Sequence, residues 1–304
     1  MSDQSTIAVI GLGSMGLGMA RSALRAGRTV RGYDVNADAL KAFSQEGGLA
    51  SASLQEAAAD ADIAVIVVVN AAQTEAVLFA EGGVVSALRP GAVIVSCATI
   101  SPSEAKGFAS RAEAAGLLYL DGPISGGAKK AASGDLTFMA SGSAQAFAAA
   151  RPALDAMAGT VYELGDQAGI GSSFKVVNQL LAGVHIAAAC EAIAFAKSLD
   201  LDISRVFEVI TKSAGNSWMF ENRIPHVLSG DYTPHSAVSI FTKDLGIVSD
   251  IGRKVKFPLP ITAAALQLFI MTEAAGMGRD DDSSVARLLA KIAGLRLPGM
   301  SEEV

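Results

Sequence analysis

The strongest restriction on the fold comes from a glycine-rich segment near the start of the chain, Gly11-Leu-Gly-Ser-Met-Gly16. It follows a short apolar run, Thr6–Ile10, that is typical of a buried strand, and it precedes helical sequence. In such a segment the first glycine permits a tight turn, the second lets the backbone approach a pyrophosphate, and the third lets the helix pack on the strand. This order predicts an α/β fold that binds a dinucleotide at the helix N-terminus. The residues expected to contact it here are Gly11, Leu12, Gly13, Ser14, Met15 and Gly16.

Asp34 follows the second predicted strand, Thr29–Tyr33, and is the residue that indicates which dinucleotide binds. It lies eighteen positions after Gly16, close to the spacing of about 20 at which an acidic residue contacts the adenosine ribose. A carboxylate there accepts hydrogen bonds from the 2′-hydroxyl and repels a 2′-phosphate. We therefore expect NAD rather than NADP as the cofactor, with Arg31 on the same strand as the one residue that could favour NADP.

The strands predicted after Asp34 are apolar runs that alternate with helical segments, as in a Rossmann domain whose parallel sheet is covered on both faces. They span residues 62–69, 91–96, 117–120, 134–140 and 161–164, and the last is expected to close the sheet. Ligands bind at the carboxyl ends of such strands. Val69, Asn70 and Thr99 are therefore expected beside the ribose or the nicotinamide. The alternative for Asn70 and Thr99 is ordinary turn and helix-cap polarity.

Residues 125–127, Ser125, Gly126 and Gly127, form a second candidate binding segment, which we call the Ser-Gly-Gly loop. Its backbone amides and its hydroxyl could hold a small carboxylate, although the same sequence could be only a flexible turn. Cys97 has no evident histidine partner in the sequence, so we expect it to pack as a small apolar residue.

A long apolar helix is predicted over residues 172–197, and it carries a cation in its first turn. Lys175, Asn178 and Gln179 are spaced so that all three project from one face. A helix N-terminus disfavours a lysine, and burial would add to that effect, so we expect a lowered pKa for Lys175 and a neutral amine accessible near pH 7. The alternative is a first-turn lysine that reaches into solvent.

Strand patterns largely stop beyond this helix, and residues 204–214, 218–228, 241–254, 261–275 and 283–293 are predicted helices. The chain is long enough, at 304 residues, for two domains with cores of their own. We therefore predict a Rossmann dinucleotide-binding domain over residues 1–166 and an all-helical domain over residues 167–304, joined by the long central helix.

Composition excludes several classes of protein. The net charge of -6 and the lack of a basic run argue against binding to nucleic acid. The longest uninterrupted apolar run, residues 63–69, is far shorter than a membrane span, and the two cysteines fit a reducing compartment, so we expect a cytoplasmic protein with no membrane contact. With 51% hydrophobic and 18% charged residues, large buried helical surfaces and a homodimer or homotetramer are expected. No metal site is predicted, and the acidic residues 280–282 are interpreted as helix-cap residues.

Four segments of the chain, in one order, resemble the β-hydroxyacid dehydrogenase family, which includes 3-hydroxyisobutyrate dehydrogenase and, more distantly, 6-phosphogluconate dehydrogenase. These segments are Gly-Leu-Gly-Ser-Met-Gly at 11–16, Asp-Gly-Pro-Ile-Ser-Gly-Gly at 121–127, Gly-Ile-Gly-Ser-Ser-Phe-Lys-Val-Val-Asn-Gln at 169–179 and Lys-Asp-Leu at 243–245. The family often has Asp-Ala-Pro where this chain has Asp-Gly-Pro.

The resemblance implies an NAD-dependent oxidation of a small hydroxy acid. It implies that Lys175 is the catalytic residue, that Asn178 orients the substrate, and that the Ser-Gly-Gly loop binds the substrate carboxylate. It also implies that Thr99 and Lys243 contact the cofactor. Two alternatives stay open at this point: a different activity of the same family, such as reduction of a semialdehyde, and a dinucleotide-binding module without catalysis.

Overall fold

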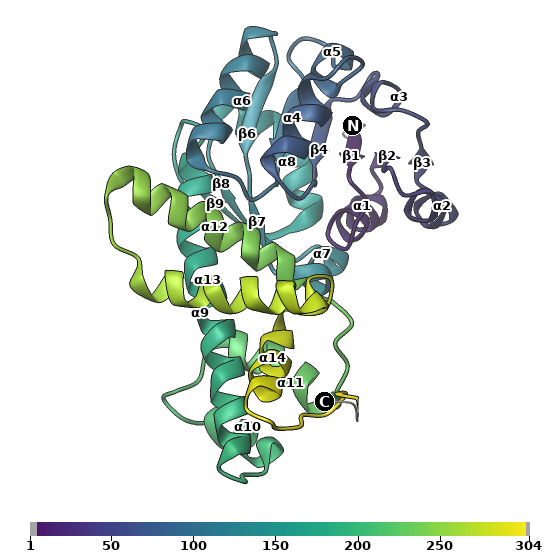
Figure 1. Cartoon of the computed structure of the whole chain (residues 1–304). Helices are drawn as coiled ribbons and strands as arrows, with labels where there is room; N and C mark the ends of the chain where they lie inside the picture. The colour runs from purple at the N-terminus through teal and green to yellow at the C-terminus, as the bar shows by residue number, and fades with distance from the viewer. Residues whose placement is uncertain (1–4, 302–304) are drawn as a thin grey trace. The chain divides into compact units, whose positions relative to one another are not determined.

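The computed structural model describes residues 5–301 and shows an α/β part followed by a helical part (Figure 1). The chain divides into two compact units between Lys175 and Val176. This boundary lies inside the long helix α9 (Ile170–Ser198). The limits 1–166 and 167–304 place the boundary just before that helix, and they stay a prediction.

The first unit is built on a six-stranded parallel sheet with the order β3-β2-β1-β4-β5-β6 (Figure 1). Alternation along each strand sends Val9 and Val65 into one apolar core and Ala8 and Ala64 into another. The sheet is therefore covered on both faces, which confirms the predicted doubly wound fold. The strands are β1 (Thr6–Ile10), β2 (Thr29–Tyr33), β3 (Leu49–Ala50), β4 (Ile63–Ile66), β5 (Val93–Ser96) and β6 (Leu118–Asp121). The helices between them are α1 (Gly16–Arg25), α2 (Ala37–Gln45), α3 (Leu54–Ala58), α4 (Ala71–Phe79), α5 (Val84–Ala87) and α6 (Pro102–Ala114).

A second, three-stranded sheet corrects one prediction, because residues 161–164 do not close the parallel sheet. β8 (Leu136–Ala140) pairs antiparallel with β7 (Ile124–Ser125) and parallel with β9 (Ala158–Glu163). Helix α7 (Gly127–Ser133) connects β7 to β8, and α8 (Ala144–Met157) connects β8 to β9. The apolar pattern predicted the strands correctly, but a period of two residues does not specify which strand is the neighbour.

The second unit is helical, and residues 176–301 contain no strand. Its core joins Ile186 and Ile193 of α9 to Ile224, Leu245 and Phe269 of three other helices. Between α9 and α12 the contact is close, since a Cβ on Gly183 would lie 2.8 Å from the Leu245 side chain. The elements after α9 are α10 (Ile203–Ile210), α11 (Trp218–Ser229), α12 (Val238–Val255), α13 (Pro260–Thr272), the π-helical η1 (Glu273–Met277), the 3-10 helix η2 (Asp282–Ser284) and α14 (Val285–Ile292). The five predicted helices are confirmed, each with slightly shifted ends.

Two helical stretches, Ile170–Ser198 and Pro260–Met277, are long and apolar enough to cross a membrane by length and composition alone. In the first, 56% of the most apolar window is buried in the molecule, and in the second 22%. This criterion allows polar residues within a helix, so it does not contradict the prediction that the longest uninterrupted apolar run, residues 63–69, is too short to span a membrane. Core helices of soluble proteins pass the same test.

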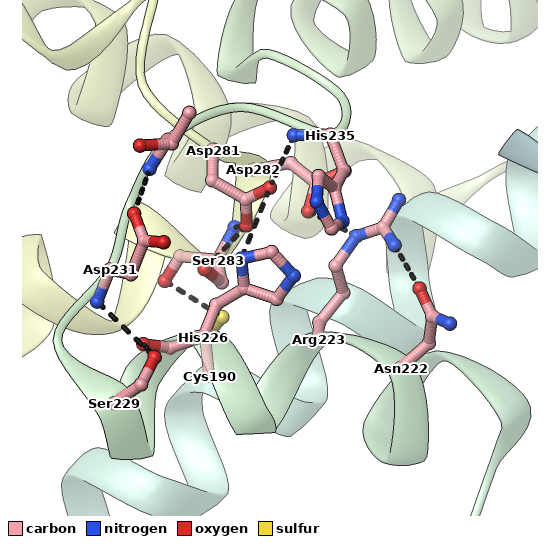
Figure 2. A network of polar contacts seen from close by, with 11 residues as sticks. Cys190, Asn222, Arg223, His226, Ser229, Asp231, His235, Asp281, Asp282 and Ser283 are labelled. Carbon is pink, nitrogen blue, oxygen red and sulfur yellow. Dashed lines mark hydrogen bonds and ion pairs between the residues drawn. The ribbon is translucent and has the colours of Figure 1, made fainter. Parts of the chain in front are cut away.

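A buried polar network holds α11 to η2 in the second unit (Figure 2). Asp281 and Asp282 are completely buried, and Arg223 donates from Nε to Asp282 Oδ1 over 2.6 Å. Asp281 accepts from the backbone N–H groups of His235 and Ser283 over 3.1 Å each, and His226 Nδ1 lies 3.8 Å from its Oδ2. Asp281 caps η2, as predicted for this acidic segment. The network also buries two charges that the sequence pattern placed at a helix end.

The stability of the protein should depend on pH through Asp282. Complete burial raises the pKa of Asp282 from 3.8 to about 7, and Asp281 adds to the shift while Arg223 opposes it. Because the folded state holds this proton more tightly, the contribution of Asp282 to the free energy of unfolding should be full below about pH 4 and should be lost as the pH rises towards 7. One such group changes the free energy of unfolding by at most about 1.4 kcal/mol per pH unit.

Urea denaturation of the wild type and Asp282→Asn between pH 4.5 and 7.5 tests this expectation. Near pH 4.5 the variant and the wild type should be similarly stable, because a protonated Asp282 and an asparagine are both neutral and both offer an acceptor oxygen to Arg223. The free energy of unfolding of the variant should fall less steeply with rising pH than that of the wild type. Parallel curves for the two proteins would contradict the assignment to Asp282.

Candidate active site

The glycine-rich segment has the geometry needed to receive a pyrophosphate. Gly11 has φ +94°, and a Cβ there would lie 2.6 Å from the carbonyl oxygen of Val67. A Cβ on Gly16 would lie 1.8 Å from the carbonyl oxygen of Gly11, so the start of α1 can pack on β1 only without a side chain at this position. A Cβ on Gly13 would meet no atom within 4 Å. The middle glycine therefore leaves space at the N-terminus of α1, whose first turn carries no acidic residue.

A hollow of about 350 Å³ adjoins this N-terminus. Its wall combines residues of the glycine-rich segment with one cation, Arg21, whose guanidinium is paired with the carboxylate of Glu46. The open N-terminus of α1 and the hollow beside it fit the phosphate part of a dinucleotide. The lining residues are Leu12, Gly13, Ser14, Leu17, Gly18, Arg21, Ala128 and Ala132.

Asp34 joins the end of β2 to the glycine-rich segment. Its carboxylate accepts hydrogen bonds from the backbone N–H of Leu12 over 2.5 Å and from that of Asn36 over 2.7 Å. Arg31, the residue that could favour NADP, instead donates to the backbone carbonyls of Glu56 and Ala59 in and after α3. The guanidinium is thereby engaged away from the carboxylate, which supports the choice of NAD.

The polar residues at the other strand ends have structural roles of their own. Asn70 caps α4, with its side chain accepting from the backbone N–H of Gln73 over 2.8 Å, and Gln73 in turn accepts from the N–H of Val69 over 2.8 Å. Thr99 is half-buried after β5. Cys97 is buried, and burial raises the pKa of its thiol, which confirms that it packs as an apolar residue. Contacts of Val69, Asn70 and Thr99 with a cofactor stay a prediction.

The Ser-Gly-Gly loop turns sharply from β7 into α7. Gly126 has φ +141° and Gly127 has φ +74°, which are conformations that a residue with a side chain rarely adopts. A Cβ on Gly126 would also lie 2.9 Å from the side chain of Lys130. Two glycines are thus required by the backbone itself, and the turn leaves its amides near a hydroxyl, as binding of a carboxylate needs.

Lys175 lies beside this loop and does not reach into solvent. Its side-chain Nζ donates to the carbonyl oxygen of Ile124 over 2.7 Å, and the residue is 7% exposed. The alternative of a solvated first-turn lysine is therefore wrong. Because Ile124 precedes Ser125, the structure brings an amine next to the candidate carboxylate loop, which the sequence could connect only through the family resemblance.

Asp121 fixes the helix that carries Lys175, and the sequence analysis missed this role. Its buried carboxylate accepts from the backbone N–H groups of Gly169 and Ser172 over 2.8 and 2.9 Å and from the Ser172 hydroxyl over 2.7 Å. Ser141 accepts from the N–H of Gly171 over 2.9 Å. Burial raises the pKa of Asp121, and these hydrogen bonds oppose the rise. The available signal was an acidic residue at the end of a strand together with a helix start that lacks an acidic cap.

In the second unit, Asn178 and Lys243 belong to one chain of polar contacts. Asn178 Nδ2 donates to Gln179 Oε1 over 2.9 Å, and Gln179 Nε2 donates to Asp244 Oδ2 over 2.5 Å. Lys243 Nζ lies 2.6 Å from Asp244 Oδ1 as an ion pair. Gln179 and Asp244 are buried, and the sequence analysis did not single out Asp244.

Two family models together match almost the whole chain. Residues 6–165 match the NAD binding domain of 6-phosphogluconate dehydrogenase, and residues 169–289 match the model described as NAD-binding of NADP-dependent 3-hydroxyisobutyrate dehydrogenase. The chain belongs to the β-hydroxyacid dehydrogenase family. As a member of this family, it is an oxidoreductase that uses NAD to oxidise the CH–OH group of a small hydroxy acid.

Relatives and solved structures agree with this membership over nearly their full lengths. The chain is 51% identical to an L-threonate dehydrogenase of Cupriavidus necator over 97% of this chain and 99% of the relative. It is 46% identical to an L-threonate dehydrogenase of Escherichia coli K12 over 96% of each. The crystal structure of a 3-hydroxyisobutyrate dehydrogenase from Salmonella typhimurium is 48% identical, with a TM-score of 0.90, over 94% of this chain and 100% of that one.

Replacement of Asp34 by Ser should weaken the discrimination of this β-hydroxyacid dehydrogenase against NADP. Removing the carboxylate removes its repulsion of a 2′-phosphate and its hydrogen bond to the ribose. We expect the ratio of kcat/KM for NAD to that for NADP to fall by about tenfold or more, the factor that corresponds to about 1.4 kcal/mol. Asp38→Ser, which removes an exposed acid from the first turn of α2, is the matched control and should leave the ratio unchanged. An unchanged ratio in Asp34→Ser would contradict the role of Asp34.

Proposed function

We propose that this enzyme oxidises L-threonate at C2 to 2-oxo-tetronate, also called 2-dehydro-L-erythronate. The observation that carries the proposal is the buried amine of Lys175 beside the Ser-Gly-Gly loop, which pairs a base with a carboxylate site. L-threonate dehydrogenases at 46–51% identity support this substrate. The segments that most resemble that enzyme are residues 178–186, 216–223 and 230–237.

Lys175 acts as the general acid and base of the reaction. As a neutral amine it accepts the proton of the C2 hydroxyl, and as an ammonium it returns that proton in the reverse direction. When bound, NAD supplies the nicotinamide C4 that accepts the hydride. The carbonyl of Ile124 takes one N–H of Lys175, which holds the amine in place so that its remaining positions serve the substrate.

The Ser-Gly-Gly loop holds the substrate carboxylate. The backbone amides of Gly126 and Gly127 and the hydroxyl of Ser125 donate to it, and the turn that presents these groups needs glycine because φ is +141° at Gly126 and +74° at Gly127. Asn178, three residues after Lys175 on α9, orients the hydroxylated part of the substrate. Thr99 and Lys243 contact the cofactor.

Oxidation of 3-hydroxyisobutyrate is the second candidate activity. It is favoured by the Salmonella typhimurium protein, which is described as a 3-hydroxyisobutyrate dehydrogenase and is as similar to this chain as the L-threonate dehydrogenases are. Both reactions use the same base and the same carboxylate loop. Only the part of the site that meets the rest of the acid would differ.

Formation of NADH on a panel of acids separates the two candidates. The panel contains L-threonate, its stereoisomers, 3-hydroxyisobutyrate, glycerate and 4-hydroxybutyrate. We expect L-threonate to give the highest kcat/KM and Lys175→Ala to lose about 10²–10⁴-fold in kcat while still binding NADH. Lys197→Ala, at the other end of the same helix, is the control and should keep full activity. If another acid gave the highest kcat/KM, the proposed substrate would be wrong. If kcat fell by less than tenfold in Lys175→Ala, the proposed role of Lys175 would be wrong.

The subunits assemble as a homodimer or homotetramer in this proposal. Helix α13 is apolar nearly all round, yet it buries only the stripe formed by Thr262, Ala265, Phe269 and Thr272. Ile261 and Met271, on other faces of the helix, are 65% and 44% exposed. A helix of this kind is normally covered on several sides, and a second copy of the chain would cover it. The two buried free cysteines, Cys97 and Cys190, support a cytoplasmic location.

Light scattering after size exclusion measures the assembly directly. We expect a dimer or tetramer for the wild type and a smaller species for Ile270→Glu, because a charge would be buried without a partner in the interface. Gln267→Glu adds the same charge on the same exposed helix where a polar residue already stands, and it should leave the mass unchanged. A monomeric wild type in aqueous buffer would contradict the proposal.

A further inference from the structure

Asp244 is a buried carboxylate that the mechanism above does not use. It lies in α12 and is 2% exposed. Its Oδ1 faces the ammonium of Lys243 and its Oδ2 faces the amide of Gln179. Burial of a carboxylate is costly unless each oxygen is compensated, so these two contacts fix how the group can act.

A carboxylate accepts hydrogen bonds and donates none, so Asp244 dictates the direction of every contact that follows from it. Gln179 must turn its NH₂ group towards Asp244, which leaves its Oε1 on the other side. Asn178 must then turn its own NH₂ group towards Gln179. The carbonyl oxygen Oδ1 of Asn178 is left at the outer end of this relay, where it accepts no hydrogen bond from residues 5–301 of the structure.

We infer that Asp244 is a positioning residue that makes Asn178 present a hydrogen-bond acceptor to the substrate. The inference rests on the proposed function, in which Asn178 faces the substrate and Lys175 takes the proton of the reacting hydroxyl. That proton cannot also be donated to Asn178. The acceptor therefore serves a hydroxyl that keeps its proton, and the enzyme selects an acid with at least one hydroxyl besides the one that is oxidised.

Asp244→Asn reverses the relay, since Lys243 is a donor only. The new amide must turn its oxygen towards Lys243 and its NH₂ group towards Gln179. Gln179 then turns its oxygen inward, and Asn178 presents NH₂ in place of the carbonyl. The variant thus changes a hydrogen-bond acceptor into a donor at a residue that is not itself altered.

Substrate analogues with fluorine in place of a hydroxyl test whether Asn178 presents an acceptor or a donor, because fluorine is of similar size to a hydroxyl but cannot donate a hydrogen bond. The experiment compares kcat/KM for L-threonate with kcat/KM for its 3-deoxy-3-fluoro and 4-deoxy-4-fluoro analogues. In the wild type we expect one analogue to be at least about tenfold worse than L-threonate, since the carbonyl of Asn178 loses its donor. In Asp244→Asn we expect that ratio to fall by about tenfold, because an N–H group tolerates fluorine.

Two further variants separate positioning from loss of structure. Asp282→Asn removes a second buried aspartate of the same unit that also pairs with a basic residue, and it should leave the ratio unchanged. Gln179→Met breaks the relay without altering Asp244, and it should reduce the ratio even if Asp244→Asn does not fold. The KM for NAD is recorded in all variants, since Lys243 loses a charged partner only in Asp244→Asn.

The inference is overturned if the wild type tolerates both fluoro analogues, or if the ratio is the same in the wild type and in the folded relay variants. Failure of L-threonate as a substrate is a different result, because it overturns the proposed substrate alone. In that case the same comparison is made on the acid that the wild type oxidises best, with fluorine at its other hydroxyls. A best acid with a single hydroxyl would itself overturn the inference.

Discussion

The carboxylate of Asp121 is the interaction on which the first unit's chemistry depends. It accepts three hydrogen bonds from the start of α9, so the helix begins at a fixed point and Lys175 follows within two turns. A helix N-terminus carries a partial positive charge that disfavours a lysine in its first turns. The buried negative charge of Asp121 offsets that effect and also fills the role of the cap that residues 169–172 do not supply. The position of the amine is therefore set by a residue about fifty positions earlier in the chain.

Glycines that look like binding residues have separate reasons to be glycine. Gly11, Gly16 and Gly171 are each forced by backbone atoms that a Cβ would strike, since the Cβ of Gly171 would lie 2.2 Å from the carbonyl oxygen of Met139. Substitutions at these positions would damage the fold before they affected a ligand. Gly13 is different, because nothing in the protein occupies the space of its side chain. Among the glycines of that segment, it is the one whose lack of a side chain is best explained by a molecule that approaches from outside.

The sequence predicted the parallel sheet and the helical second half because both depend on local periodicity, which a single chain shows directly. It left open whether Lys175 is buried, because a first-turn lysine looks the same whether it is buried or solvated, and only the family resemblance implied that this lysine is catalytic. The separate sheet of β7, β8 and β9 was not predicted. Its first strand, β7, has only two residues and follows β6 after a short turn, so the sequence gives no sign that a new sheet begins there. The positioning roles of Asp121 and Asp244 were not predicted, and the reason is the same for both. Their hydrogen-bond partners lie 48 to 65 positions away in the chain, and no rule of sequence spacing applies at such separations.

Few charges are buried in a chain with only 18% charged residues, and the buried aspartates of the second unit act in a common way. Asp244 and Asp282 each lie beside one basic side chain, which compensates the charge, and Asp244 together with Asp281 directs the donors of neutral groups around it. An asparagine in place of Asp244 would bring a donor as well as an acceptor, so either group could in principle face Gln179, and Lys243 would turn the donor that way. A carboxylate has no donor to offer, so it removes that choice. Burial of a charge costs stability, but it gives the neighbouring amides and hydroxyls a single orientation. Asn178 needs such a fixed orientation if the enzyme is to select a substrate with a second hydroxyl.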